Sequence, residues 1–293
     1  MLKQIKKVAL VTNFNIYDKA KYATDVARVL IGEGCEIITS SYNRDKIEKI
    51  CPGMAITYVQ SEKLYRSCEL VVVLGGDGTI LESARRASPL EIPIIGINLG
   101  RVGYMAEIEV GEIESLKRIV SGDYEIEERS MLSVEIITGD GRVRSSNYAL
   151  NDAVLSNGSI SRIVDLELSE GGVLISSYRS DGIIISTPTG STAYSMSAGG
   201  AVVDPRLSCI CVTPICPHSL SARPLIFPDS AVLNIKNVCQ REKMLYLTVD
   251  GRVNFELFRG ESVRITRSPL TTRFVRLNKS GFYIKLRQKM NEK

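Results

Sequence analysis

Several features that would define a particular class of protein are missing from this 293-residue chain. It has a single histidine, which excludes a metal site built from histidines. No apolar run approaches the ~20 residues of a membrane-spanning helix, and the apolar stretch near the N-terminus is too short for a secretory signal. There is no dense block of Lys and Arg, and the net charge is +4, which argues against a dedicated nucleic-acid surface. We therefore expect a cytoplasmic protein with no nucleic-acid or membrane partner, whose mild positive charge suits anionic small molecules.

The number and spacing of the cysteines also exclude some classes of protein. There are seven of them, an odd number, and no C-x-x-C pair, so a full disulfide framework is excluded. Cys209, Cys211 and Cys216 lie near His218, but their spacing fits no standard zinc site. We expect reduced core thiols and no metal held by the protein's own side chains.

The first part of the chain alternates short apolar runs with helical periodicity, a pattern typical of βαβ units around a parallel sheet. From about residue 124 the pattern changes to short alternating strands with hairpin signals such as Asp140-Gly141. We expect an α/β domain over residues 1–123 and a mostly antiparallel, sandwich-like β domain over residues 124–270. Residues 271–293 should form a C-terminal segment, partly helical, that packs back on the first domain.

A glycine-rich turn, Gly75-Gly76-Asp77-Gly78-Thr79, follows the apolar run at residues 70–74. Glycines let backbone N–H groups approach a phosphate closely. The helix expected at residues 80–87 would add its N-terminal N–H groups and its dipole. The turn is not a P-loop, because no Lys-Ser/Thr pair closes it, and it lacks the third glycine of a dinucleotide fingerprint.

Asp77 is the informative residue of this turn, because a carboxylate repels phosphate. Its presence makes sense if it accepts a proton from a hydroxyl while a phosphoryl group is transferred. The hypothesis is therefore a phosphotransferase, and the alternative is a simple tight turn between a strand and a helix. The next expected strand, residues 94–97, runs into a second glycine-containing loop at residues 98–104. Ligands bind at the carboxyl ends of strands in such sheets, so we expect both loops to face one site.

A hydroxyl-rich segment, residues 180–200, lies in the second half of the chain. An apolar strand ends there at Thr187-Pro188, and Ser and Thr residues are expected to cap the helix that follows. Such a segment suits a hydroxylated or anionic ligand such as a nucleotide, although Ser/Thr clusters also simply cap helices. Asn151-Asp152 offers an amide beside a carboxylate, a pair able to bind ribose hydroxyls or to form an ordinary exposed turn.

Together these motifs resemble the NAD kinase family, whose members phosphorylate NAD to NADP with ATP or polyphosphate. The resemblance follows the family's order over nearly the whole chain, and the segment at residues 181–200 is its most specific part. It also includes the segments at residues 75–79, 98–104, 151–152, 218–225 and 250–251.

The resemblance implies a catalytic base, Asp77, which takes the proton of the 2′-hydroxyl of the adenosine ribose. It implies a phosphate-side loop made of Gly75, Gly76, Gly78 and Thr79. The residues that it implies for NAD binding are Tyr104, Asn151, Asp152, Asp181, Thr189, Thr192, Ala193, Tyr194, Ser197 and His218. It further implies Mg²⁺ or Mn²⁺ bridging the donor phosphates and a homodimer or homotetramer.

The chain departs from the family pattern at a few positions. Asp152 stands where Glu is more usual, Tyr104 and Val102 replace Phe and Leu, and Arg252 replaces Gln. None of these is the expected base, so they bear on substrate preference. Two other functions remain open: a lipid kinase, which shares the glycine turn but needs an apolar acceptor pocket or membrane surface, and a protein that senses NAD without chemistry.

Overall fold

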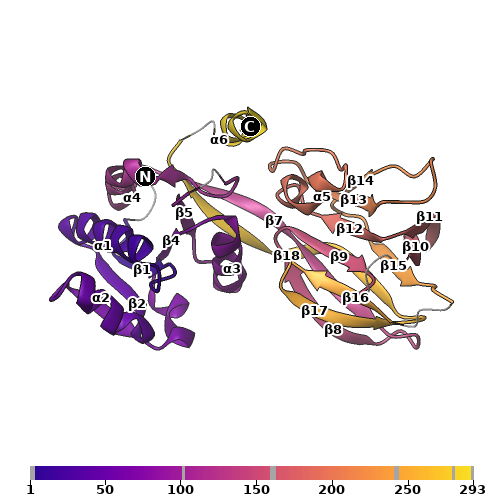
Figure 1. Cartoon of the computed structure of the whole chain (residues 1–293), viewed down its shortest axis with the longest axis horizontal. Helices are drawn as coiled ribbons and strands as arrows, with labels where there is room; N and C mark the ends of the chain where they lie inside the picture. The colour runs from indigo at the N-terminus through magenta and orange to yellow at the C-terminus, as the bar shows by residue number, and fades with distance from the viewer. Residues whose placement is uncertain (1–3, 101–102, 159–162, 241–243, 279–280, 292–293) are drawn as a thin grey trace. The chain divides into compact units, whose positions relative to one another are not determined.

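The computed structural model describes residues 4–100, 103–158, 163–240, 244–278 and 281–291. The chain divides into two compact units, one made of residues 1–128 with 272–293 and the other of residues 129–271 (Figure 1). The boundary after residue 128 lies inside a strand, whereas the sequence pattern placed it after residue 123.

The first unit is built on a parallel sheet with the order β3-β2-β1-β4-β5. Its strands are β1 (Lys7–Val11), β2 (Glu36–Ser40), β3 (Ile56–Val59), β4 (Leu70–Leu74), β5 (Ile94–Asn98) and β6 (Ile108–Glu109). Its helices are α1 (Tyr17–Gly32), α2 (Arg44–Ile50), α3 (Asp77–Ala87), α4 (Lys117–Val120) and α6 (Gly281–Asn291). The strand order changes direction between β1 and β4, where ligands bind in open α/β sheets. The expected α/β fold of this unit is confirmed.

Helix α1 illustrates how the sequence builds this unit. Ala20, Ala23, Ala27 and Leu30 recur at helical spacing, and all four are buried against the sheet. In Figure 1, α1 and α2 lie beside β1 and β2. The helix ends before Gly34, whose φ of +84° is a left-handed conformation that glycine adopts without strain.

The C-terminal segment returns to the first unit, as expected. The last part of β18 (Ser262–Arg276) pairs in parallel with β5, with Phe274 opposite Ile94. Glu107, whose side chain is 2 % exposed, forms an ion pair with Arg276 at 3.0 Å. It also accepts the N–H groups of Leu277 and Asn278 at 2.9 and 3.0 Å. These bonds compensate a buried carboxylate that would otherwise be costly to desolvate.

The second unit is antiparallel throughout, apart from short helical turns. One sheet has the order β14-β13-β12-β9-β16-β17. Among the other strands, β11, β10, β15 and β18 are hydrogen-bonded side by side in that order, and β7 and β8 form a hairpin. The strands are β7 (Glu125–Ile137), β8 (Val143–Ala149), β9 (Asp152–Ser156), β10 (Val164–Glu170), β11 (Val173–Ser180), β12 (Gly182–Ser186), β13 (Cys209–Ile215), β14 (Leu225–Pro228), β15 (Leu233–Asn237), β16 (Met244–Val249) and β17 (Val253–Phe258). One short helix, α5 (Tyr194–Ser197), follows the 3₁₀ turn η6 (Gly190–Thr192).

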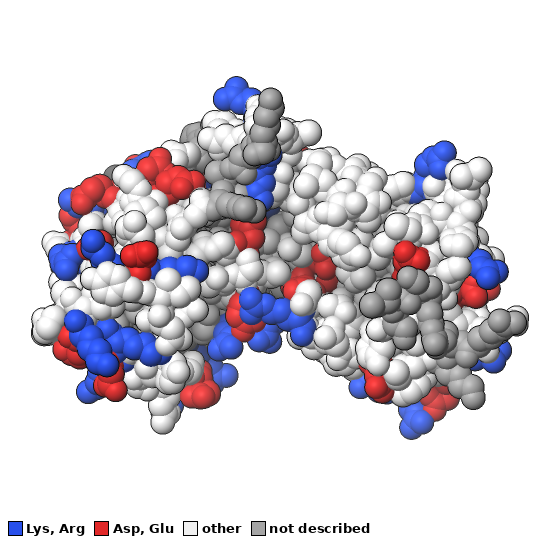
Figure 2. Space-filling view, in the orientation of Figure 1, with Lys and Arg blue, Asp and Glu red and all other residues white. Residues whose placement is uncertain are grey.

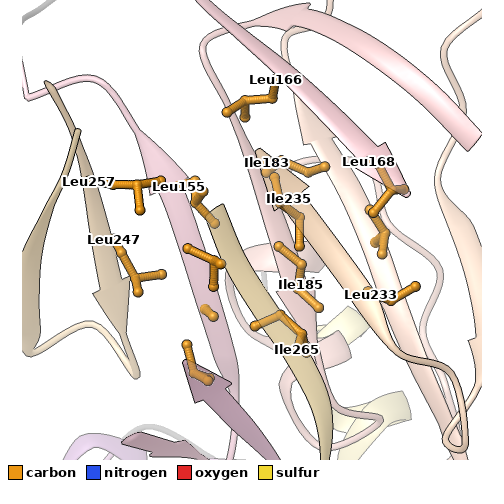
Figure 3. Packing of buried hydrophobic residues seen from close by; sticks show 14 of the residues in the cluster. Leu155, Leu166, Leu168, Ile183, Ile185, Leu233, Ile235, Leu247, Leu257 and Ile265 are labelled. Atoms are coloured by element: carbon orange, nitrogen blue, oxygen red, sulfur yellow. The ribbon is translucent and has the colours of Figure 1, made fainter. Parts of the chain in front are cut away.

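Alternate residues of these strands form one apolar core. Leu155 of β9, Ile183 and Ile185 of β12, Leu247 of β16 and Ile265 of β18 are each at most 1 % exposed (Figure 3). Each buried aliphatic side chain contributes roughly 1.5–3 kcal/mol relative to an exposed one. The core therefore fixes β9 and β12, the two strands that carry the candidate ligand-binding residues. The expected sandwich-like β domain is confirmed.

The distribution of surface charge and the state of the cysteines fit the mild net charge and the odd number of cysteines. On the face seen in Figure 2, Lys and Arg residues are interspersed with Asp and Glu. Exposed pairs such as Arg142–Asp140, 2.6 Å apart, contribute little to stability. All seven cysteines are free thiols. In the described ranges no helix is long and apolar enough to cross a membrane.

Candidate active site

The glycine turn begins at the carboxyl end of β4, and both neighbouring strands anchor it. The Gly75 N–H donates to the Ile97 carbonyl of β5 at 3.0 Å. Thr12, which follows β1, donates its hydroxyl to the Leu74 carbonyl at 2.8 Å. The turn is thus fixed where the strand order changes direction, the position that favours ligand binding.

Each glycine of the turn is needed for a different structural reason. A Cβ on Gly75 would lie 2.8 Å from the Thr79 hydroxyl oxygen, closer than real Cβ contacts. Gly76 is extended, with φ −85° and ψ 179°, and its carbonyl accepts the Thr79 N–H at 2.9 Å. Gly76 and Gly78 are exposed, so a ligand can approach their backbone directly.

Asp77 is the first residue of α3, which begins three residues earlier than the sequence pattern predicted. That expectation was wrong because the extended Gly76 acts as the N-cap and lets the helix start at once. The Asp77 carboxylate accepts the Tyr104 N–H at 3.0 Å and the Met105 N–H at 3.1 Å. The two loops predicted separately from the sequence therefore meet at this carboxylate. Residues 101 and 102, including the departure Val102, lie outside the described residues.

Gly103 completes the backbone cradle around Asp77. A Cβ on Gly103 would lie 2.9 Å from the Asp77 carboxyl carbon and closer still to Oδ1. Tyr104, the next residue, is half-buried, and the Lys289 ammonium lies 4.8 Å from its ring centroid. The cradle therefore has room for the carboxylate only because residue 103 has no side chain.

We predict that Gly103→Ala lowers kcat for phosphoryl transfer by about 10- to 100-fold, because the added methyl displaces the Asp77 carboxylate from its two N–H donors. The melting temperature should change little, since Asp77 is the flexible partner that yields. Gly111→Ala is the matched control, because a Cβ there meets nothing within 4 Å. Unchanged turnover in Gly103→Ala would show that the position of Asp77 is not critical.

The second group of candidate residues gathers at one end of β12 in the other unit. Ser186, the last residue of β12, is paired with Asp152, the first of β9. Just beyond, the Thr187 N–H donates to the Asn151 carbonyl at 2.9 Å. Antiparallel pairing thus brings Asn151-Asp152 beside the hydroxyl-rich turn that follows β12, although 36 residues of numbering separate Asn151 from Thr187.

Gly190 allows that turn to pack directly on Asn151. A Cβ at residue 190 would lie 2.8 Å from the Asn151 Cα and closer still to its carbonyl. The Gly190 N–H donates to the Thr187 hydroxyl at 3.0 Å, and this hydroxyl donates to the Leu150 carbonyl at 2.5 Å. The amide oxygen of Asn151 is buried and, among the described residues, has no hydrogen-bond partner. Such a buried acceptor can take a hydrogen bond from a ligand donor.

The hydroxyl residues of the turn do not cap a helix, so that expectation was wrong. The helix is only the 3₁₀ turn η6 followed by the single turn α5, and neither has a side-chain cap. Ser191 instead donates to the Pro188 carbonyl at 2.7 Å and accepts the Val203 N–H at 2.9 Å. Its hydroxyl holds the turn to a later segment.

The five predicted NAD-binding residues of this turn differ in exposure. Thr189 and Thr192 are buried, Ala193 is half-buried, and Tyr194 and Ser197 are exposed. All five follow the same end of β12, within one short stretch of backbone. The turn therefore places the two buried threonines, Thr189 and Thr192, close in sequence to the exposed ring of Tyr194.

Asp181 and His218 lie at the opposite end of β12. The Asp181 N–H donates to the Ile215 carbonyl at 3.0 Å, and the His218 N–H donates to the Arg179 carbonyl at 2.8 Å. At ~3.3 Å per residue, the five residues of β12 separate this end from Ser186 by roughly 13 Å. The structure thus brings Asp181 and His218 near each other, but not near Asn151.

Arg129 belongs to the site although the sequence pattern did not single it out. It is 6 % exposed, and its guanidinium donates to the Thr189 hydroxyl at 3.1 Å. Because Thr189 accepts this bond, its own O–H stays available to donate to a ligand. The sequence carried no signal, since Arg129 lies in a strand among ordinary charged residues.

A pair of carboxylates, Asp152 and Asp250, lies at the start of β9. Asp152 is 6 % exposed and Asp250 is 9 % exposed. Burial, followed by the negative charge of Asp250, raises the pKa of Asp152 to about 7. Asp152 therefore changes its charge near neutral pH, which an exposed aspartate does not do.

We predict a pH-dependent difference in stability between the wild type and Asp152→Asn. The raised pKa means that the folded state binds more protons than the unfolded state between about pH 4 and pH 7. Stability from this group is therefore complete below pH 4 and is lost as the pH rises to 7. Relative to the non-titrating variant, the wild type should lose at most about 4 kcal/mol over that range. Urea denaturation at pH 5 and pH 8 measures it; parallel pH profiles would contradict the raised pKa.

Within the described ranges, no group of three or more His, Cys, Asp or Glu side chains is placed to hold a metal ion. The residues near the glycine turn provide one carboxylate, Asp77, whose oxygens already accept two N–H groups. The residues that the structure describes thus do not offer a complete donor set of their own. A divalent metal fits this site only together with ligand phosphates, which supply the remaining oxygens.

The fold and these residues define a class. An α/β unit with an anchored carboxylate in a glycine turn, linked to a β unit with a buried hydroxyl surface, is the architecture of a phosphotransferase. Family models agree: the ATP-NAD kinase N-terminal domain matches residues 8–124, and the ATP-NAD kinase C-terminal domain matches residues 150–277.

Curated relatives and solved structures point the same way. The chain is 43% identical over 228 residues to an NAD kinase of Heliobacterium modesticaldum, covering 78% of this chain and 80% of the relative. It is 36% identical to an NAD kinase of Desulforamulus reducens, covering 97% of both. The crystal structure of yeast NADH kinase complexed with NADH superposes with a TM-score of 0.89 at 25% identity, covering 99% of this chain and 89% of that one. The crystal structure of an NAD kinase from Archaeoglobus fulgidus in complex with ATP superposes with a TM-score of 0.73 at 26% identity, covering 96% of this chain and 98% of that one. The chain belongs to the NAD kinase family.

Proposed function

We propose that this protein transfers the γ-phosphate of ATP to the 2′-hydroxyl of the adenosine ribose of NAD and so produces NADP. The observation that carries the proposal is the Asp77 carboxylate, held by two backbone N–H groups inside a glycine turn at a strand end. A protein that only bound phosphate would gain nothing from a negative charge there. Polyphosphate is the alternative donor.

Asp77 acts as the general base. Each of its oxygens accepts one backbone N–H, and an ionised carboxylate has about four acceptor positions, so two remain for the substrate. The carboxylate takes the proton of the 2′-hydroxyl as the hydroxyl oxygen attacks the γ-phosphorus and the bond to the departing diphosphate breaks. The backbone donors fix its orientation beforehand, which lowers the entropic part of the barrier.

Gly75, Gly76, Gly78 and Thr79 bind the donor phosphates. The exposed backbone of Gly76 and Gly78 and the N-terminal end of the 11-residue helix α3 support this role. A divalent metal, Mg²⁺ or Mn²⁺, held by the donor phosphates would supply neutralisation of their charge. No residue of the chain is assigned to the metal.

Asn151 and Asp152 bind NAD through ribose hydroxyls, together with Thr189, Thr192, Ala193, Tyr194 and Ser197. The unsatisfied Asn151 amide oxygen and the available Thr189 hydroxyl support this role. Tyr104 is also assigned to NAD binding, as the family resemblance implies. Asp181 and His218, at the far end of β12, would bind a part of NAD distant from Asn151.

The homodimer or homotetramer and the cytoplasmic location stay predictions from the sequence and the family resemblance. Sedimentation velocity of the purified protein tests the first of them. A monomer at all concentrations would contradict it.

The proposed reaction is tested by incubating the wild type with NAD, ATP and Mg²⁺ and detecting NADP with an NADP-specific dehydrogenase. We expect NADP formation that requires all three components. No NADP with ATP or polyphosphate, and with Mg²⁺ or Mn²⁺, would contradict the proposed function.

A further inference from the structure

Asp250 makes an unusual set of bonds to the segment that carries the candidate NAD-binding pair. Its Oδ2 accepts the Leu150 N–H at 2.9 Å, and its Oδ1 accepts the N–H groups of Asn151 and Asp152 at 2.8 and 3.1 Å. In return, the Asp250 N–H donates to the Asp152 carbonyl at 2.9 Å. One side chain thus fixes three consecutive peptide groups, and hydrogen bonds to a charged acceptor are the stronger kind.

The backbone of Asp250 is arranged for this task. Its φ is +49°, in the left-handed region that few residues other than glycine adopt but that Asp and Asn tolerate best. Gly251 follows with φ +68°, so the two residues form a tight turn directly after β16. A left-handed non-glycine residue costs free energy, and the bonds to residues 150–152 offset that cost.

The charge of Asp250 acts on the same segment. Asp152 is flanked by Ser186 on β12, and the β16 residue nearest this end is Val249, paired with Ala153. Neither Ser186 nor Val249 carries a charge. Asp250 is thus the charged group that raises the pKa of Asp152, in addition to burial.

We propose that Asp250 is a positioning residue for NAD: through its bonds to residues 150–152 it holds Asn151 and Asp152 in the orientation that binds the ribose, and it places a negative charge beside the Asp152 carboxyl group. The inference rests on the proposed function, because Asn151 and Asp152 are there assigned to NAD. A carboxylate that accepts ribose O–H groups binds better when ionised. NAD affinity should therefore rise as the pH increases through about 7 in the wild type.

Asp250→Asn removes the negative charge and one of the two acceptor oxygens. Asparagine has nearly the same size and tolerates the left-handed conformation. At pH 8.5, where Asp152 is ionised in both proteins, we expect the Kd for NAD to rise about 10-fold, with kcat within about twofold. The pH at which affinity changes should move below that of the wild type, because Asp152 then ionises more easily.

Asp250→Glu is the complementary variant. It retains the negative charge but cannot place its oxygens on the same three N–H groups. We expect weaker NAD binding with the pH transition left near that of the wild type. Glu256→Gln, an exposed charge removal in the same unit, is the control and should change neither property.

The measurements are NAD binding by calorimetry between pH 5.5 and 8.5 and the titration of the Asp152 carboxyl carbon by NMR, assigned with Asp152→Asn. They do not require turnover. An Asp152 pKa unchanged in Asp250→Asn, or NAD affinity unchanged in both Asp250 variants, would overturn the proposal even if the wild type makes NADP. If Asp250→Asn does not fold, Asp250→Glu and the titration of the wild type still test the proposal. An Asp152 pKa in the ordinary range of an aspartate, or a wild-type Kd for NAD that does not change with pH, would contradict the proposal. Absence of NADP formation by the wild type would instead count against the proposed function.

Discussion

Asp77→Asn is expected to lower kcat for NADP formation by about 10²- to 10⁴-fold, the usual contribution of a general base. The amide has the size of the carboxylate and can still accept the N–H of Tyr104 or Met105, so the turn should keep its conformation. It cannot take up a proton from the attacking hydroxyl. The Kd for NAD should therefore change less than about threefold, while single-turnover NADP formation nearly stops.

The control for this variant is Glu82→Gln in the same helix. Glu82 pairs with Arg85 and Arg86 on the helix surface, so its loss removes a charge without touching the turn. We expect near wild-type kcat for it. Turnover of Asp77→Asn comparable to that of Glu82→Gln would show that Asp77 is not the base.

The second large effect is expected from Gly190→Ala. The added Cβ would meet the backbone of Asn151, with 2.8 Å to its Cα, and a backbone cannot move aside as a side chain can. The turn and the start of β9 must separate, and overpacking of this kind costs about 3 kcal/mol. We expect a lower denaturation midpoint and at least a tenfold loss of NAD affinity, measured by urea titration and calorimetry.

Gly139→Ala provides the comparison within the same unit, because a Cβ there meets only the Gly260 carbonyl at 3.9 Å. It should retain stability and NAD affinity. Wild-type affinity in Gly190→Ala would mean that contact between the turn and Asn151 is unimportant for the ligand.

The elements that depend on local pattern could be predicted from the sequence. Buried parallel strands such as β4 are continuous apolar runs, and α1 repeats alanines at helical spacing, so both were recognised. The glycine turn was recognised for the same reason, since its chemistry lies in five consecutive residues. The start of α3 was misplaced because the pattern of buried residues begins at Ile80, after the first helical turn.

Features that depend on pairing between distant strands could not be read from the sequence. The three N–H bonds of Asp250 join residues about a hundred positions apart. The placement of Asp181 at one end of β12 and Asn151 at the other follows from antiparallel register. Arg129 reaches Thr189 across 60 positions without any local signal. Such contacts are set by the sheets, and one-dimensional patterns do not contain them.

The central claim is that the phosphoryl group goes to one particular hydroxyl of NAD. The most direct measurement is transfer from γ-³²P-labelled ATP to NAD, followed by isolation of the product and location of the phosphate by ³¹P NMR. We predict one labelled product that carries its new phosphate on the 2′-hydroxyl of the adenosine ribose, absent with Asp77→Asn. Label on another hydroxyl, or release of inorganic phosphate without labelled NAD, would contradict it.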